Sequence, residues 1–132
     1  MKKKFKKFRK KSGTLIPFSY KKDFPIKSKR VFFISGKKNF IRGNHAHKKC
    51  SQYLIPLLGK IQITLINKKG KKVFNLNANN SYGYLVKPKS WLKIKFLTKY
   101  SILMVVCDME YNFDDYIEKF ECLSLFLRPK NL

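Results

Sequence analysis

Short stretches of hydrophobic residues follow one another along most of the chain, and turn-forming residues separate them. Ile61, Thr64 and Ile66 against Gln62 and Asn67 show the partial alternation that is typical of half-buried strands. Turns rich in Gly, Asn, Lys and Pro divide the chain at regular intervals. The pattern predicts strands over residues 14–19, 30–34, 44–48, 52–58, 61–67, 72–76, 82–86, 91–96 and 102–107. Many short strands at this spacing indicate an all-β sandwich or barrel.

The end of the chain has a different pattern. Asp114 is a suitable N-cap for a helix whose apolar stripe is Tyr116, Ile117 and Phe120, and residues 121–127 continue that helix or return as a strand. We therefore expect one short C-terminal helix.

Length and composition set the size of the fold. The chain has 132 residues, of which 44% are hydrophobic and 15% aromatic, which excludes two full domains and a disordered chain. We expect a basic N-terminal arm over residues 1–11 and a single domain over 12–132. The longest apolar run, residues 102–107, is far shorter than the about 20 residues of a membrane span. The basic start lacks an apolar signal region, so we expect a cytoplasmic chain.

The charge is strongly positive, with 31 Lys and Arg against 7 Asp and Glu, a net charge of +24. Such a charge suggests nucleic acid as a partner. However, all but four of the basic residues are lysines scattered along the chain. Proteins that recognise the phosphates and bases of nucleic acids favour arginine. The composition therefore disfavours nucleic acid and indicates a general attraction for anionic small molecules.

Acidic residues and cysteines narrow the possible chemistry. Before residue 108 the only carboxylate is Asp23, so any acid–base role in that part of the chain falls on other groups. Cys50, Cys107 and Cys122 are widely spaced and odd in number, which argues against a disulfide framework or a zinc knuckle and predicts free thiols.

The two histidines, His45 and His47, form the most informative motif. Residues i and i+2 of a strand share a face, so the two imidazoles project side by side, with Arg42 just upstream. A structural pair, a metal site and metal-free acid–base chemistry are the three alternatives. The metal site is disfavoured because Gln52 stands near the place of an expected Glu and no third His exists. Histidine titrates near neutral pH, and Arg42 can stabilise an oxyanion or a phosphate.

These residues resemble a known family. The segment RGNHAHK over residues 42–48, with Gln52 and Gly59, is similar to the signature of the sugar-nucleotide 3,4-ketoisomerases of the FdtA/QdtA type, which are WxcM-like cupins. The resemblance extends over about residues 12–125. It includes the segments 13–18, 24–26 and 30–34, Pro88 and Trp91, and a C-terminal set of Tyr111, Asp114, Asp115, Tyr116 and Ile117.

The resemblance implies a small jelly-roll cupin barrel and a homodimer that exchanges N-terminal strands. It implies a metal-independent isomerase without a cofactor, which moves the ketone of dTDP-4-dehydro-6-deoxyglucose from C4 to C3. The product would lead to 3-amino-3,6-dideoxy sugars of surface glycans such as lipopolysaccharide. We expect His45 to transfer the carbon-bound proton and His47 the oxygen-bound proton, with Arg42 at the enolate or pyrophosphate.

Gln52, Trp91 and Phe33 are the expected substrate-binding residues. Gln52 would bond a sugar hydroxyl or orient His47, and Trp91 would stack on thymine or pack in the core. Phe33 stands where the family commonly has a tyrosine, whose role would be lost or taken by Tyr20, Tyr53 or Tyr82. The alternative function is a non-catalytic basic β-barrel that binds a nucleotide sugar or nucleic acid.

Overall fold

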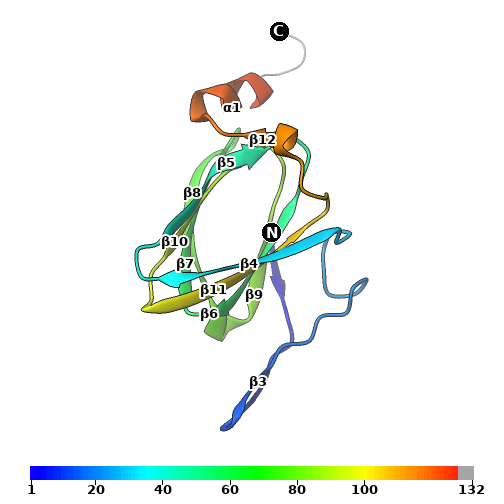
Figure 1. Cartoon of the computed structure of the whole chain (residues 1–132), viewed down its shortest axis with the longest axis vertical. Coiled ribbons are helices and arrows are strands. Elements are labelled where there is room, and N and C mark those ends of the chain that lie inside the picture. Colours follow the sequence, from blue (N-terminus) through cyan, green and yellow to red (C-terminus); the bar gives the residue numbers. More distant parts are fainter. Residues whose placement is uncertain (128–132) are drawn as a thin grey trace.

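Two five-stranded antiparallel sheets face each other and form most of the molecule (Figure 1). The computed structural model describes residues 1–127. One sheet has the order β1 (Lys2–Lys4), β9 (Tyr82–Val86), β6 (Gln52–Leu58), β11 (Tyr100–Cys107) and β4 (Arg30–Lys37). The other has the order β12 (Tyr116–Ile117), β5 (Ile41–His47), β10 (Trp91–Phe96), β7 (Lys60–Asn67) and β8 (Gly70–Asn77). The expected all-β class and cupin-like barrel are confirmed.

The main core lies between the two sheets. Alternate residues of β7 and β10 point inward, so Ile61, Ile63 and Phe96 are completely or almost completely buried. They meet Leu54 of β6 and Leu103 of β11, which are also fully buried. Burial of each such side chain stabilises the fold by about 1.5–3 kcal/mol. This packing fixes which face of each strand is available to a cavity inside the barrel.

A second cluster covers the outer face of β6 and β11. Tyr53 and Val106 lie on this face, where Phe5, Phe18 and Phe24 of the N-terminal segment contribute to the same cluster. The Tyr53 hydroxyl donates a hydrogen bond to the carbonyl of Lys3 at 3.2 Å. Both faces of this sheet are therefore used, one by the main core and one by the N-terminal segment.

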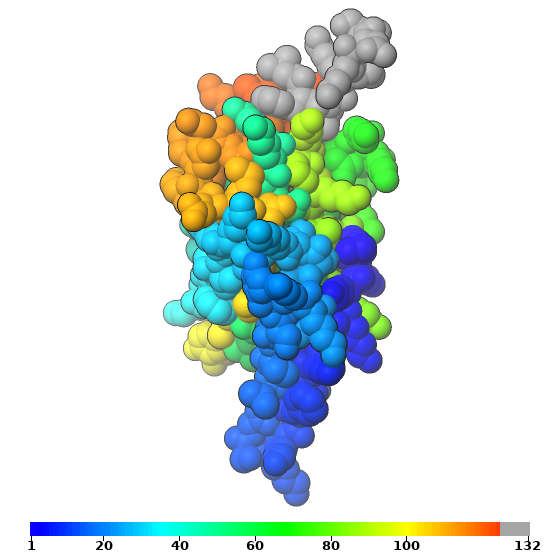
Figure 2. All heavy atoms as spheres, turned by 90° about the vertical axis from the view of Figure 1, so that its right-hand side faces the viewer, coloured from blue at the N-terminus to red at the C-terminus, as the bar shows by residue number. Residues whose placement is uncertain are grey.

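The first residues of the chain, where we expected a basic arm over residues 1–11, contribute to the barrel. Strand β1 pairs with β9 in the sheet, and Phe5 is buried in the second cluster. Strands β2 (Phe8–Lys10) and β3 (Gly13–Leu15) then form a two-stranded hairpin that projects from the barrel (Figures 1 and 2). Burial of Phe5 and backbone pairing of β1 with β9 hold this segment against the barrel, although it is rich in lysine. The long lysine side chains can still reach solvent.

The C-terminal segment also differs from the expectation. The helix α1 spans Phe120–Leu127 and does not begin at Asp114. Asp114 lies in the 3₁₀-helix η2 (Phe113–Asp115), which Asn112 caps, and Tyr116–Ile117 adds strand β12 to the edge of β5. The other 3₁₀-helix, η1, spans Ala78–Asn80. The last five residues of the expected domain lie outside the described range.

The remaining expectations on strand positions are close to the structure. The predicted strand 44–48 belongs to the longer β5, whereas the predicted strand 14–19 is limited to β3, which ends at Leu15. All three cysteines are free thiols, as expected. None of the helices within residues 1–127 combines the length and apolar character that a membrane crossing requires.

Candidate active site

A bulge in β5 sets the position of the histidines. Gly43 has φ +87° and Asn44 has φ +56°, and the pairing of β5 with β10 shifts register between Leu92 and Lys93. Glycine adopts this left-handed conformation at little cost, and asparagine tolerates it better than most residues. After the bulge the strand resumes, so His45 and His47 lie on one face, with ring centroids 5.1 Å apart. The expectation of two neighbouring imidazoles is confirmed.

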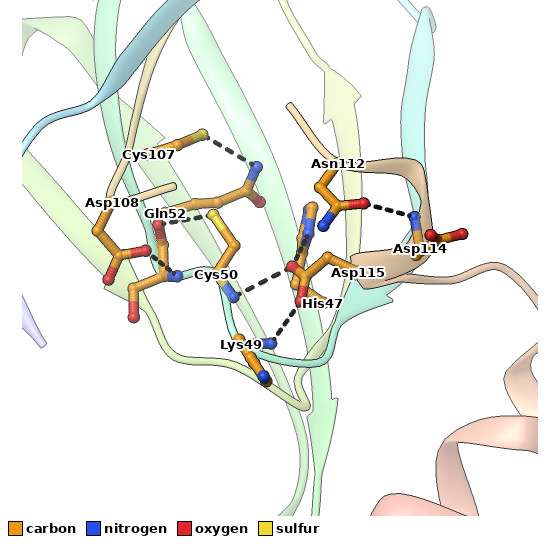
Figure 3. A network of polar contacts seen from close by, with 10 residues as sticks. His47, Lys49, Cys50, Gln52, Cys107, Asp108, Asn112, Asp114 and Asp115 are labelled. Carbon is orange, nitrogen blue, oxygen red and sulfur yellow. Dashed lines mark hydrogen bonds and ion pairs between the residues drawn. The ribbon is translucent and has the colours of Figure 1, made fainter. Parts of the chain in front are cut away.

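Asp115 holds His47 in a single orientation (Figure 3). The Nδ1 of His47 lies 3.0 Å from Oδ2 of Asp115, and both residues are buried. The same carboxylate accepts hydrogen bonds from the backbone N–H of Lys49 at 2.8 Å and of Cys50 at 3.1 Å. An ionised carboxylate only accepts, so Nδ1 of His47 carries the proton and Nε2 presents a lone pair. This Nε2 is buried and has no partner within residues 1–127.

A backbone contact orients His45 in a similar way. Its Nδ1 lies 3.2 Å from the carbonyl oxygen of Gly43, at the bulge. A carbonyl only accepts, so the proton is on Nδ1 and the Nε2 of His45 is also a potential base. Both histidines therefore have the tautomer that general base catalysis requires.

The surroundings keep both imidazoles neutral near pH 7. Burial lowers the pKa of His45 below its ordinary value, and the neighbouring His47 lowers it further. Burial also lowers the pKa of His47, while the hydrogen bond and the charge of Asp115 act in the opposite direction. A neutral imidazole can act directly as a base. Of the two histidines, His47 lies beside a carboxylate, Asp115, which can stabilise the imidazolium that forms.

A cavity of about 720 Å³ opens beside the histidines. It lies within the size range of small-molecule sites. Strands β4, β5, β6, β10 and β11 form its walls, and Arg42, His45 and Gln52 line it as expected. Two features make it suitable for an anionic ligand: it contains Arg30 and Arg42, and among residues 1–127 Glu118 is the only acidic residue of its lining.

Aromatic rings contribute to the lining of this cavity. The guanidinium of Arg30 lies over the rings of Phe32, at 4.8 Å, and Tyr111, at 5.0 Å. Tyr116 lines the cavity and contacts both imidazoles, with centroid distances of 4.9 Å to His45 and 4.3 Å to His47. Its ring therefore lies against the two groups that would transfer protons.

The other two expected substrate-binding residues differ in position: Trp91 lies away from the cavity, and Phe33 lies at its edge. Trp91 is 9% exposed and packs with Ile117 and Leu123 beneath α1, with its ring edge-to-face against Phe120. It is thus a core residue of the outer face of its sheet and does not line the cavity. Phe33 adjoins the cavity, but its side chain is 62% exposed on the outward side of β4, while the adjacent Phe32 packs inward.

Gln52 lines the cavity but does not orient His47. Its side-chain amide donates to the sulfur of Cys107 at 3.7 Å, and Asp115 takes the orienting role instead (Figure 3). The thiol of Cys50 donates to the carbonyl oxygen of Ser51 at 3.3 Å. Its interaction with the neighbouring Cys107 lowers the pKa of Cys107 and raises that of Cys50. The amide nitrogen of Gln52 is therefore part of a small polar network with Cys107.

A family model described as FdtA: WxcM-like, C-terminal, matches residues 1–126. The chain belongs to this family. A curated relative, the TDP-4-oxo-6-deoxy-α-D-glucose-3,4-oxoisomerase of Aneurinibacillus thermoaerophilus, is 29% identical over 129 residues, which cover 97% of this chain and 92% of the relative.

Solved structures agree with this assignment to the FdtA family. The sugar 3,4-ketoisomerase QdtA from Thermoanaerobacterium thermosaccharolyticum, in complex with TDP, has a TM-score of 0.87 and 32% identity, covering 100% of this chain and 96% of that one. A variant of QdtA with a histidine replaced by asparagine is solved with TDP-4-keto-6-deoxyglucose. The TDP-fucose-3,4-ketoisomerase WlaRA from Campylobacter jejuni has a TM-score of 0.83 and 26% identity, covering 97% and 95% of the two chains.

Sequence reasoning did not assign roles to Asp115, Arg30, Tyr111 and Tyr116. Tyr111, Asp115 and Tyr116 belong to the C-terminal set that resembles the FdtA family, which was the available signal for them. The tyrosines expected to replace the family's tyrosine do not line the cavity: Tyr53 is in the outer cluster, and Tyr20 and Tyr82 are exposed. Tyr111 and Tyr116 line it instead.

Proposed function

We propose that the chain is a TDP-sugar 3,4-ketoisomerase that converts TDP-4-dehydro-6-deoxyglucose to the 3-keto isomer. The observation that carries this proposal is the pair of oriented, neutral histidines beside a basic cavity. Membership of the FdtA family and the TDP and TDP-4-keto-6-deoxyglucose complexes of QdtA support the substrate class.

The reaction is a tautomerisation with no net change of oxidation state. A base removes the proton from C3, the electron pair of that bond forms the C3=C4 double bond, and the C4 oxygen becomes an enolate. The proton then returns to C4, and the hydroxyl proton of O3 moves to O4 as the C3 ketone forms. Because electrons only shift within the substrate, the chemistry requires a base for carbon and a proton carrier for oxygen, and we propose that no metal or cofactor takes part.

We assign the carbon-bound proton to His47, which reverses the roles expected from the sequence. Abstraction of a proton from carbon leaves an imidazolium, and Asp115 lies 3.0 Å from His47 to stabilise that charge. His45 contacts only a neutral carbonyl through its Nδ1 and borders the cavity directly, which suits proton exchange between two sugar oxygens. Access of substrate to Nε2 of His47 would require displacement of the Tyr116 ring that contacts it.

Arg42 and Arg30 are the groups proposed to bind the negative charges of the substrate. Both line the cavity, and a guanidinium binds a phosphate through parallel hydrogen bonds. The aromatic rings on Arg30 hold its side chain in place, so little conformational freedom remains to be lost when an anion binds. Gln52 is proposed to bond a sugar hydroxyl.

We also propose a cytoplasmic homodimer in which N-terminal strands are exchanged. The hairpin β2–β3 projects from the barrel (Figure 2). The side chains of Phe8 and Leu15 are 56% and 64% exposed. A 3-keto product is the substrate that an aminotransferase acting at C3 requires, which would supply 3-amino-3,6-dideoxy sugars for surface glycans such as lipopolysaccharide. Sedimentation at twice the chain mass would support the dimer.

Proton NMR in D₂O provides the direct test of the activity. EDTA-treated protein would be incubated with TDP-4-keto-6-deoxyglucose, and the proposal predicts loss of the C3 proton signal and formation of a 3-keto product. A parallel reaction in H₂O keeps a proton at C4, and the coupling of that proton to H5 would assign the product to the galacto or gluco series. Absence of both exchange and product would contradict the proposal and favour a non-catalytic module that binds a nucleotide sugar or nucleic acid.

A further inference from the structure

Three side chains that can bind a metal ion lie close together around the active-site His47. His47, Cys50 and Asp115 are all buried, and their ligand atoms lie within 4.8 Å of one another. His47 and Cys50 come from the end of β5 and the loop after it, and Asp115 comes from η2 (Figure 3). Nothing in the isomerase reaction requires the Cys50 thiol.

The donor set fits zinc better than the hard cations. Imidazole, thiolate and carboxylate are all zinc ligands, with bonds of about 2.0–2.3 Å, whereas Mg²⁺ and Ca²⁺ prefer oxygen alone. Ligand atoms at a tetrahedral zinc ion are therefore about 3.3–3.6 Å apart. Nδ1 of His47 and Oδ2 of Asp115 are already 3.0 Å apart, so modest side-chain rotation would complete the geometry.

We propose that His47, Cys50 and Asp115 form a zinc-binding site whose occupation inhibits the enzyme. The metal takes the place of the proton between His47 and Asp115, with the Cys50 sulfur as the third ligand and one position left open to water. Asp115 retains its hydrogen bond from the backbone of Lys49 through Oδ1.

Charge and protons balance in this step. The Cys50 thiol loses its proton to solvent, and the Nδ1 proton of His47 moves to Nε2 of the same ring. One thiolate and one carboxylate then neutralise Zn²⁺, so the buried site carries no net charge. The thiol pKa of Cys50 is raised in the free protein, so the metal itself must supply the driving force for deprotonation.

The consequence for catalysis follows from the tautomer. The proposed reaction needs the lone pair on Nε2 of His47, and zinc at Nδ1 places a proton there. The metal-loaded protein therefore has no base at this position, and zinc and turnover exclude each other. This inhibition rests on the proposed isomerase function, whereas the metal site itself does not.

Cobalt and zinc titrations of EDTA-treated protein test the site. Co²⁺ bound to a thiolate gives a near-ultraviolet charge-transfer absorption, which is read without any activity assay. We expect this absorption in the wild type and in Cys122→Ser, whose thiol lies on α1 outside the cluster, and its loss in Cys50→Ser and Cys50→Ala. Circular dichroism would verify that the variants are folded.

Zinc inhibition is measured for each variant relative to its own rate without zinc, and EDTA should restore that rate. The zinc concentration for half-inhibition should rise about tenfold or more in the Cys50 variants and stay unchanged in Cys122→Ser. Equal absorption in the wild type and the Cys50 variants, or none in any of them, would overturn the site. If the protein binds cobalt through Cys50 but never isomerises the sugar, the metal site stands and the proposed function fails.

Discussion

The two histidines of the candidate site differ in what supports them, and the difference can be measured. We predict that His47→Asn and His45→Asn each lower kcat by about 10²–10⁴. Only His47→Asn should also abolish exchange of the C3 proton in D₂O, because His47 is the proposed base for carbon. His45→Asn should retain slow exchange, since enolate formation needs only the carbon base. Equal exchange rates in the two variants would contradict this division of roles.

Asp115 is a positioning residue, and its effect should appear in the pH profile. The carboxylate raises the pKa of His47 against the lowering effect of burial, so Asp115→Asn lowers that pKa further. The acidic limb of the kcat/KM profile should therefore move to lower pH, while the maximum rate falls because the imidazolium loses its partner. Asp114→Asn, an exposed neighbour in η2, is the control and should change neither.

Thermal unfolding of Asp115→Asn distinguishes positioning from folding. The amide can accept with one oxygen only, so a backbone N–H of Lys49 or Cys50 loses its acceptor, and we expect a lower Tm. A lower Tm without displacement of the acidic limb would limit Asp115 to a structural role.

Residues close in sequence could be placed without a structure, and distant ones could not. The i, i+2 spacing put His45 and His47 on one face, and Arg42 and Gln52 on the same segment reached the cavity. The pairing of His47 with Asp115, 68 residues away, depends on how β12 meets β5. Trp91 shows the other limit: it shares the outer face of its strand with Lys93 and Lys95, and its burial there depends on Ile117 and Leu123, which are distant in sequence.

At the scale of elements, the bulge in β5 should be sensitive to substitution of Gly43. A Cβ on Gly43 would lie 2.6 Å from the carbonyl oxygen of Leu92, at φ +87°. Gly43→Ala should therefore lower the free energy of unfolding by more than about 1 kcal/mol. It should also lower kcat, because the Gly43 carbonyl orients His45.

Gly13→Ala is the matched control for the bulge. No atom lies within 4 Å of the added methyl group, and its φ is not in the left-handed region. Chemical denaturation and steady-state rates of the two variants would be compared. If Gly43→Ala is as stable and active as Gly13→Ala, the bulge does not set the histidine geometry.

The type of an element was predictable where its apolar residues followed a single periodicity, that of a strand or that of a helix. Strands β7 and β10 sit within a residue of their expected ranges because their inward residues are apolar and their neighbours are turns. The start of α1 was not predictable, because Tyr116, Ile117 and Phe120 fit a helical stripe equally well. Asp115 decides against that helix, since its side chain and carbonyl bind the backbone of residues 48–50 and hold Tyr116–Ile117 as a strand.

For the whole molecule, the net charge of +24 has a kinetic consequence. The proposed substrate carries a pyrophosphate, and a strongly positive surface around a cavity with two arginines attracts it before contact. Salt screens this attraction beyond about 10 Å at 0.1 M. We predict that kcat/KM falls by about tenfold as salt rises from 0.02 to 0.5 M, while kcat is nearly constant, because proton transfer between bound groups is shielded from solvent ions.

The variant Arg42→Gln, measured in the same salt series, distinguishes attraction by the net charge of the whole protein from binding by Arg42 in the cavity. The charge falls by only one of 24, so the slope of kcat/KM against ionic strength should be nearly preserved while KM rises at every salt concentration. A slope that vanishes in Arg42→Gln would assign the attraction to the cavity alone. The scattered lysines would then have no role in capturing the substrate, and their number would have to be explained on other grounds.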